Sequence, residues 1–259
     1  MHFAGSKSVS ESVELPFKYY FNNVCSSILL GRIMAKYDVK NLIFSSSATV
    51  YGEPSSVPIS ESFPISSMNP YATSKIQVEK YLRKISVDSP DWRIVVLRYF
   101  NPIGAHESGL LGDNPNDKPN NLMPFILKVA AKEEEYLEVF GNDYETEDGT
   151  GVRDYIHVSD LSDAHVSSLN YLFSSQDDSG FYHTINIGTG TGYSVLEIIE
   201  TFKRINNIDI PYKIVNRRPG DVSQSFTDTQ LSREILQWRA KKDLNDMCRD
   251  SWDWKRAEI

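Results

Sequence analysis

The chain has 259 residues, a formal net charge of −8 and a sequence pI near 5.2. Apolar residues make up 40% and charged residues 24%, which is typical of a globular protein of one or two domains rather than a disordered one. The acidic balance argues against nucleic acid as a partner, and no apolar run approaches the roughly 18 residues of a membrane span.

Four regular elements are predicted in the first hundred residues. An apolar pattern with a period near 3.6 residues predicts a helix from about Pro16 to Tyr37 and a second helix over Pro70–Asp88. The apolar runs Asn41–Ser45 and Arg93–Phe100 predict strands buried on both faces. Helices that alternate with such strands through short connections indicate an α/β fold with a parallel sheet.

The texture of the sequence changes after Asn101. Residues 102–121 and 141–154 are rich in glycine, proline, asparagine and aspartate, and loops of this length are usually functional. Residues 102–259 are expected to form mainly a smaller α+β lobe, with segments at about 155–190 that return to the first sheet. The periodic segments predict helices near 122–132, 159–173, 194–206 and 243–256, and strands near 136–140, 182–187 and 212–215.

The first chemical pattern is a tyrosine four residues before a lysine on the second helix. This spacing puts Tyr71 and Lys75 on one helix face, where a nearby ammonium lowers the pKa of a phenol. Such a tyrosine can take a proton from a sugar hydroxyl while a hydride leaves the same carbon. Because the chain holds 14 tyrosines, the pair taken alone is more typical of an exposed Tyr–Lys pair on a helix.

Three serines end the first predicted strand. Ser45, Ser46 and Ser47 lie where open α/β sheets bind their ligands, at the carboxyl end of a parallel strand. A hydroxyl there can hydrogen-bond the substrate oxygen that the tyrosine deprotonates. Taken alone, the run is more typical of a polar exit from a strand.

Several motifs together resemble a known family. They look like the successive signatures of the UDP-glucose 4-epimerases, which belong to the extended short-chain dehydrogenase/reductase superfamily. The resemblance covers nearly all 259 residues, and the stretch from Asp148 to Val158 is its most specific part. In chain order the motifs are His2–Gly5, Ser45–Gly52, Pro70–Lys75, Leu97–Pro102, Pro119–Pro124, Phe140–Tyr144, Asp148–Val158 and Arg217–Asp221.

This resemblance implies roles for particular residues. Ser47, Tyr71 and Lys75 match the catalytic hydroxyl, the base and the lysine that holds the nicotinamide ribose. Contacts with the cofactor NAD are implied for Phe3, Ala4, Gly5, Lys7, Asn22, Ser45, Tyr71, Lys75 and Tyr99. Contacts with a UDP-hexose substrate are implied for Ser47, Asn101, Asn121, Leu122, Phe140, Arg153, Arg218, Asp221 and Ser225. Arginine forks suit pyrophosphate oxygens, and a carboxylate suits ribose hydroxyls.

The implied reaction is the NAD-dependent interconversion of UDP-glucose and UDP-galactose, a step of galactose metabolism. Tyr71 would remove the 4-hydroxyl proton while the C4 hydride passes to NAD. The 4-keto sugar would then turn over in the site, and hydride would return to its opposite face.

The implied fold is an NAD-binding Rossmann domain over residues 1–101, a doubly wound parallel sheet, joined to the substrate lobe over 102–259. The family begins with a strand, a Gly-rich turn and a helix that hold the NAD pyrophosphate, and nothing in this chain matches them. On the order of 60–80 residues would precede His2 in the family. We therefore expect a truncated sheet with open edges, poor solubility and little NAD-dependent activity of the 259 residues alone.

Three alternatives are weighed against this function. A nucleotide-sugar 4,6-dehydratase needs an Asp–Glu pair just after the catalytic hydroxyl, where this chain has Ala48 and Thr49. A catalytically inactive remnant, or a UDP-sugar-binding module, is favoured by the unmatched pyrophosphate segment. A nucleic-acid-binding or scaffold protein has no support beyond the acidic composition.

The resemblance also implies a gate for the substrate, four residues beyond Asp221. Counting gives Ser225, a small residue that leaves room for an N-acetyl group at C2 of the sugar. A slip of one residue would place Phe226 there and reverse the expectation.

The location and assembly are expected to be those of an ordinary metabolic enzyme. Cys25 and Cys248 have no metal-ligand spacing and predict free thiols in a reducing cytosol, and the scattered histidines predict no metal site. The first five residues lack the features of a signal peptide, so we expect a cytoplasmic protein. The resemblance implies a homodimer for the full-length form.

Overall fold

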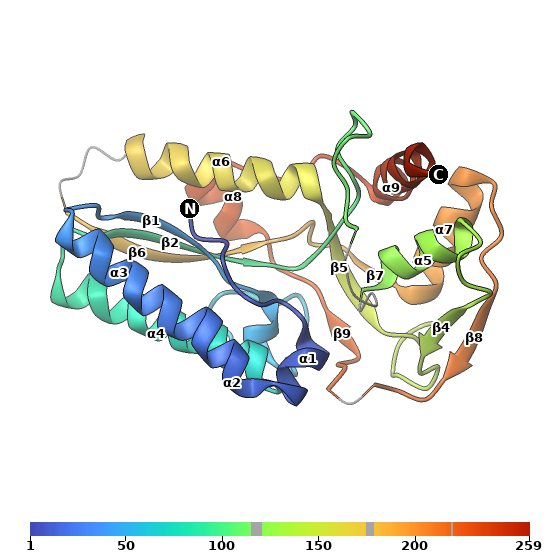
Figure 1. Ribbon diagram of the computed structural model, residues 1–259, viewed down its shortest axis with the longest axis horizontal. Coiled ribbons are helices and arrows are strands. Elements are labelled where there is room, and N and C mark those ends of the chain that lie inside the picture. The colour runs from blue at the N-terminus through green and yellow to red at the C-terminus, as the bar shows by residue number, and fades with distance from the viewer. Residues whose placement is uncertain (115–120, 175–178, 219) are drawn as a thin grey trace. The chain divides into compact units, whose positions relative to one another are not determined.

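The computed structural model in Figure 1 describes residues 1–114, 121–174, 179–218 and 220–259. The chain divides into two units, each built from three separate segments. Unit 1 comprises Met1–Tyr99, Ala164–Ile187 and Thr229–Trp238. Unit 2 comprises Phe100–Asp163, Gly188–Asp228 and Arg239–Ile259. Among the described residues, no helix has the length and apolar content to cross a bilayer.

A three-stranded parallel sheet forms the centre of unit 1. Its order is β1-β2-β6, with β1 at Asn41–Ser45, β2 at Arg93–Tyr99 and β6 at Phe181–Ile187. His2 forms an isolated parallel bridge with Phe44, so the N-terminal segment follows the outer edge of β1. The strands predicted from the apolar runs are confirmed, and the α/β fold with a parallel sheet is the one observed.

Helices cover both faces of this sheet (Figure 1). α3 (Ser26–Lys36) and α4 (Pro70–Asp88) lie on one face, and the unit 1 part of α6 (Val158–Ser174) lies on the other. Alternate strand residues pack under α3 and α4, because successive side chains of a strand point to opposite faces. This layer contains Leu42, Phe44, Ile94 and Val96 from the strands and Met34, Val78 and Leu82 from the helices. α8 (Gln230–Leu236) also belongs to unit 1.

The helix predicted from Pro16 to Tyr37 is interrupted. The chain forms α1 (Val9–Glu14), α2 (Pro16–Tyr19), a π-helical segment (Tyr20–Cys25) and then α3. The Ser27 hydroxyl donates to the Asn23 carbonyl at 2.5 Å, and such bonds compete with the regular helical ladder. The apolar period continues through the wider turn, which is why the sequence pattern does not reveal it.

Unit 2 is organised around β5 (Val152–His157). β5 pairs with β3 (Asn101–Ile103) and β9 (Gln224–Ser225) in parallel and with β7 (Gly192–Ser194) in antiparallel orientation. β5 begins inside the stretch 141–154 that we expected to be a loop. Separately, β4 (Leu137–Phe140) pairs with β8 (Tyr212–Val215) in parallel. The helices are α5 (Leu122–Ala130), α7 (Val195–Asn206) and α9 (Leu244–Glu258), which share one apolar core.

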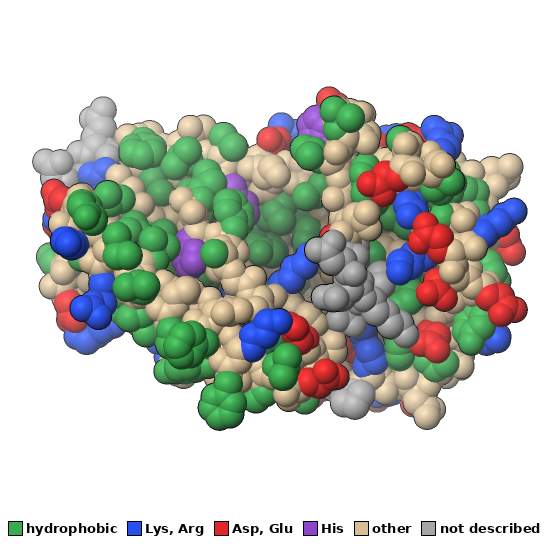
Figure 2. All heavy atoms as spheres, in the orientation of Figure 1, with side chains coloured by type: hydrophobic (Ala, Val, Ile, Leu, Met, Phe, Trp, Pro, Cys, Tyr) green, Lys and Arg blue, Asp and Glu red, His purple; other side chains and the backbone are tan. Residues whose placement is uncertain are grey.

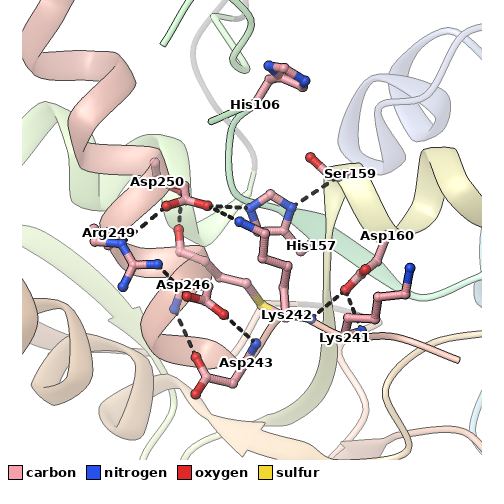
Figure 3. Close-up of polar contacts among 12 residues, drawn as sticks. His106, His157, Ser159, Asp160, Lys241, Lys242, Asp243, Asp246, Arg249 and Asp250 are labelled. Atoms are coloured by element: carbon pink, nitrogen blue, oxygen red, sulfur yellow. Dashed lines mark hydrogen bonds and ion pairs between the residues drawn. The ribbon is translucent and has the colours of Figure 1, made fainter. Parts of the chain in front are cut away.

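A buried polar cluster fastens α9 to the end of β5 (Figure 3). The Nδ1 atom of His157 accepts a hydrogen bond from the Ser159 backbone N–H at 3.0 Å, so Nε2 carries the proton toward Asp250 at 3.2 Å. The Lys242 ammonium lies 2.9 Å from the same carboxylate. Burial lowers the pKa of His157, which keeps its ring neutral. Both ring nitrogens are therefore occupied, and the cluster holds together the elements around the strand that carries Arg153.

Candidate active site

The first turns of α4 place Tyr71 and Lys75 one turn apart. Asn69 caps the helix by accepting a hydrogen bond from the Ala72 backbone N–H at 2.8 Å, and Pro70 occupies the first helical position, where no donor is needed. Both side chains are more than nine-tenths buried. The Lys75 ammonium lies 5.8 Å from the centroid of the Tyr71 ring.

Lys75 is fixed to the carboxyl end of β1. Its ammonium donates a hydrogen bond to the Ser45 carbonyl at 2.8 Å and lies 5.0 Å from the centroid of the Phe44 ring. Burial lowers the pKa of Lys75 to about 8. The side chain is therefore positively charged at neutral pH and titrates only slightly above it.

Ser47 lies beside Tyr71. Its hydroxyl oxygen accepts a hydrogen bond from the Thr49 hydroxyl at 3.0 Å, and the serine itself is buried. A hydrogen bond between the Ser47 and Tyr71 side chains lowers the pKa of the phenol, though by less than burial raises it. The strand end and the helix thus bring one hydroxyl and one phenol together.

The effect that we expected Lys75 to have on Tyr71 is not found in this structure. Burial is the largest influence on Tyr71 and raises the pKa of its phenol, and the neighbouring Tyr99 and Tyr19 raise it further. The Lys75 ammonium bonds the Ser45 carbonyl instead. The phenol therefore holds its proton at neutral pH in this structure.

The segment before α1 forms a loop that Asn23 shapes. The Asn23 side chain accepts from the Ser6 backbone N–H at 2.7 Å and donates to the Ser6 carbonyl at 3.1 Å and the Ser74 hydroxyl at 2.9 Å. Gly5 has φ +156°, and a Cβ at this position would lie 2.9 Å from the Asn23 amide oxygen. Only glycine fits such a conformation and approach. Asn22 stays exposed and donates to the Ser6 hydroxyl at 3.2 Å.

A histidine that the motifs did not indicate joins several of the residues expected to contact NAD. His165, on α6, lies 3.0 Å from the Ser45 hydroxyl through Nε2. Its ring centroid is 4.8 Å from that of Phe3 and 6.2 Å from that of Tyr99. Phe3 is 59% exposed, and Ala4, Gly5 and Lys7 are exposed as well. No sequence spacing could have found His165, because 120 residues separate it from Ser45.

In unit 2, Arg153 and Ser225 face one another across paired strands. They are register partners in the parallel pairing of β5 with β9. The Arg153 guanidinium donates to the Val152 carbonyl at 2.8 Å and to the Ser223 carbonyl at 3.4 Å. Phe226 packs against Gly192, where a Cβ would lie 2.8 Å from its ring.

The guanidinium of Arg218 is held by Asp221 and is still partly exposed. Its guanidinium donates to both carboxylate oxygens of Asp221, at 3.0 and 3.3 Å, and lies 4.9 Å from the centroid of the Phe140 ring at the end of β4. The side chain remains 46% exposed. The preceding arginine, Arg217, is engaged differently, in an ion pair with Asp143 at 2.7 Å.

Three further residues implied to contact the substrate lie at the starts of elements in unit 2. Asn101 is exposed at the start of β3, and Asn121 is exposed at the N-cap of α5 without a side-chain cap hydrogen bond. Leu122, the next residue, is half-buried. Residues 119, 120 and 219 of the quoted motifs lie outside the described residues.

Comparisons with known proteins agree on one family. The model of the NAD dependent epimerase/dehydratase family matches residues 1–188. The chain is 48% identical to the UDP-glucose 4-epimerase of Bacillus subtilis and 53% identical to that of Yersinia enterocolitica, over 100% and 99% of this chain and 75% of each relative. Among solved structures, the Bifidobacterium longum UDP-glucose 4-epimerase in complex with NAD+ and UDP has 47% identity and a TM-score of 0.93, over 99% of this chain and 75% of that chain. The Stenotrophomonas maltophila enzyme with bound NAD and formylated UDP-arabinopyranose has 46% identity and a TM-score of 0.95, with the same coverage.

Proposed function

Because the chain belongs to the NAD dependent epimerase/dehydratase family, and within it to the UDP-glucose 4-epimerases, we infer that it interconverts UDP-glucose and UDP-galactose with NAD as cofactor. The observation that carries the inference is the buried arrangement of Ser47, Tyr71 and Lys75 in a chain of this family. The hypothesis of an inactive UDP-sugar-binding module is not favoured, because the relatives at about 50% identity are UDP-glucose 4-epimerases and the groups proposed for the chemistry are present.

The residues of unit 1 fit NAD. Gly5 leaves the backbone open at a point where any side chain would strike Asn23, and the buried Lys75 ammonium is a donor suited to the hydroxyls of the nicotinamide ribose. Bound NAD would supply a reversible hydride acceptor for C4 of the sugar. We assign its binding to Phe3, Ala4, Gly5, Lys7, Asn22, Ser45, Tyr71, Lys75 and Tyr99.

The chain's own residues manage the proton of the reaction. Tyr71 takes the 4-hydroxyl proton of the sugar and later returns it to the same oxygen. Ser47 hydrogen-bonds that oxygen and keeps it aligned with the phenol. Tyr71 has to be a phenolate to take this proton, and the positive charge of bound NAD+ together with the Lys75 ammonium, one turn away, would favour that form, because an opposite charge favours the ionised phenol.

Unit 2 binds the nucleotide part of the substrate in this proposal. Arg153 and Arg218 present forked donors for the pyrophosphate oxygens, and Asp221 accepts from ribose hydroxyls. Phe140 offers an aromatic face for the base. Asn101, Asn121 and Leu122 supply the remaining contacts. A firm hold on UDP is what allows the sugar to turn over without leaving.

Substrate range tests both the function and the gate at Ser225. In a purified protein that also carries the family's pyrophosphate-binding segment ahead of these residues, we expect interconversion of UDP-glucose with UDP-galactose and also of UDP-N-acetylglucosamine with UDP-N-acetylgalactosamine, as measured by separating the products. Ser225→Tyr is expected to lower kcat/KM about tenfold or more for the acetylated pair only, because spare volume costs a smaller substrate little binding. No conversion of the unacetylated pair would contradict the function, whereas rejection of the acetylated pair by the Ser225 protein contradicts the gate alone.

An exposed apolar surface of unit 1 supports a homodimer. Figure 2 shows apolar side chains gathered along the stretch occupied by α2 and α3, and monomers rarely leave such patches uncovered. We expect light scattering to give twice the mass of one chain, and Ile33→Glu to halve it. Leu110→Glu, at a more exposed leucine of unit 2, should leave the mass unchanged. The exposed residues are Phe17, Phe21, Leu29, Ile33 and Tyr37.

We place the protein in the cytoplasm, in galactose metabolism. Both cysteines, Cys25 and Cys248, are free thiols, which suits a reducing compartment. Cell fractionation that finds the protein in an oxidising compartment would contradict this location.

A further inference from the structure

A buried carboxylate lies one helical turn beyond Lys75, and the chemistry above does not use it. Tyr71, Lys75 and Glu79 follow one another at four-residue spacing and are all buried on one side of α4. Glu79 is only 4% exposed. Carboxylates are rarely buried to this degree unless other groups compensate their charge.

The groups that compensate Glu79 come from the ends of two strands. The Arg98 guanidinium donates to both of its oxygens, through Nε at 3.0 Å and Nη2 at 2.5 Å. The Ser46 hydroxyl, just after β1, donates to Oε1 at 2.5 Å. The Tyr182 hydroxyl of β6 donates to the Glu79 carbonyl at 3.2 Å. One residue of α4 is thus bonded to segments from three strands.

Each strand-end partner of Glu79 is the neighbour of a residue of the proposed site. Ser46 immediately precedes Ser47, and Arg98 immediately precedes Tyr99. In extended chain, neighbouring side chains point to opposite sides. A bond that fixes Arg98 on one face therefore also sets the direction of Tyr99 on the other.

A chain of buried hydrogen bonds continues from Arg98 to neighbouring residues. Arg98 donates to the Tyr51 hydroxyl at 3.0 Å, which in turn donates to the Asn186 amide oxygen at 2.7 Å. The Asn186 amide group donates to the Ile59 carbonyl at 3.0 Å. Buried networks in which each member has its partners are rigid. Glu79 therefore joins the catalytic helix to a rigid support.

We propose that Glu79 is a positioning residue for the C4 chemistry, whose carboxylate fixes the ends of β1 and β2 against the catalytic turns of α4. The proposal rests on the proposed function of this site. In addition, the negative charge of Glu79 favours the ammonium form of Lys75 and opposes the effect of burial on the pKa of that side chain.

Among the titratable side chains around Glu79, Lys75 is the one whose pKa lies just above neutral pH, at about 8. Burial lowers the pKa of His2 and raises that of Tyr71, while the Glu79 carboxylate raises that of Arg98 despite its burial. Burial also raises the pKa of Tyr51 and Tyr182 to about 12. The titratable groups that face Lys75 or Glu79 are His2, Tyr71, Arg98 and Tyr182, and Tyr51 is reached through Arg98.

The test is Glu79→Gln in the purified, NAD-containing protein. We expect kcat for UDP-glucose to fall about tenfold or more near pH 7, because small misplacements of reacting groups are costly. KM should stay within about twofold, since the nucleotide-binding residues are untouched. The alkaline limb of the kcat profile should move to lower pH by about one unit, because Lys75 loses the charge that favours its ammonium. Glu79→Asp, which keeps the charge, should retain the position of that limb.

Asp160→Asn provides a matched control for the loss of a buried carboxylate. Asp160 is buried in unit 2 and accepts from the Lys241 and Lys242 backbone N–H groups. This variant should change thermal stability without moving the alkaline limb. If Glu79→Gln does not fold, Ser46→Ala tests the positioning role instead, because it removes one hydrogen bond to Glu79. Its kcat should fall several-fold at constant KM.

The outcomes separate the two ideas. The positioning role is overturned if the alkaline limb of Glu79→Gln stays in place or if its KM rises at constant kcat. An unchanged kcat in Ser46→Ala overturns it as well. A wild-type protein that does not convert UDP-glucose, or a fully active Tyr71→Phe, overturns the proposed function instead.

Discussion

Tyr71→Phe is expected to lower kcat for the interconversion of UDP-glucose and UDP-galactose by a factor of about 100 or more, with UDP affinity nearly unchanged. Loss of a general acid–base group typically costs a factor of roughly 10² to 10⁴. The phenol is the group proposed to accept the sugar proton, it lies beside Ser47, and it is more than nine-tenths buried. The residues proposed to bind UDP belong to unit 2, which the substitution does not alter.

Tyr19→Phe is the matched control for this experiment. Tyr19 is also buried, its ring packs edge-on against Tyr71 with centroids 6.3 Å apart, and its hydroxyl donates to Glu11 rather than to the site. Steady-state kinetics of both variants, with UDP binding by calorimetry, make the comparison. Turnover of Tyr71→Phe within a few-fold of the wild-type value would show that another group is the base.

Arg218→Gln is expected to weaken UDP binding about 10- to 100-fold while leaving kcat nearly constant. Hydrogen bonds to charged groups contribute about 1.5–3 kcal/mol, and each 1.4 kcal/mol is roughly a tenfold change in affinity. The fork that Arg218 makes with Asp221 keeps the guanidinium directed beside the Phe140 ring. An interaction made equally in the ground and transition states appears in KM and not in kcat.

The neighbouring arginine supplies the control. Arg217 carries the same charge one residue earlier, but its guanidinium is engaged by Asp143 and lies 4.0 Å from the centroid of the Tyr144 ring. Arg217→Gln should change the dissociation constant of UDP by less than about threefold, since exposed ion pairs contribute little. Equal losses in both variants would mean that only the net charge of this loop matters, and not the fork.

The sequence predicted the elements whose pattern is local. β1 and α4 match their predicted bounds because one is a continuous apolar run and the other begins with an Asn69–Pro70 cap and keeps its period. β5 was not among the predicted strands, because its first residues continue a stretch rich in glycine and aspartate. The π-helical segment was hidden as well, since the apolar period runs through it.

The residues of the candidate site also differ in whether the sequence could predict them. Tyr71 and Lys75 could be paired from sequence because four residues on a helix fix their geometry. Glu79 carried the same signal at the next turn, but its partner Arg98 lies on a separate strand, so only the fold reveals the buried ion pair. The direction of the Tyr71 pKa could not be predicted either, because burial outweighs the charge suggested by spacing.

The interleaving of the two units has a consequence for how the protein is made. β6 completes the sheet of unit 1, yet it is synthesised about 80 residues after β2, with the whole first segment of unit 2 in between. A ribosome translating this chain releases β1 and β2 long before β6, so the growing chain must wait with one side of β2 unpaired. Closing so long a loop is slow compared with forming local helices. For the same reason, cutting the gene after Tyr99 would not yield two fragments that fold independently. Each unit is built from three separate segments of the chain, so neither is encoded by one continuous stretch.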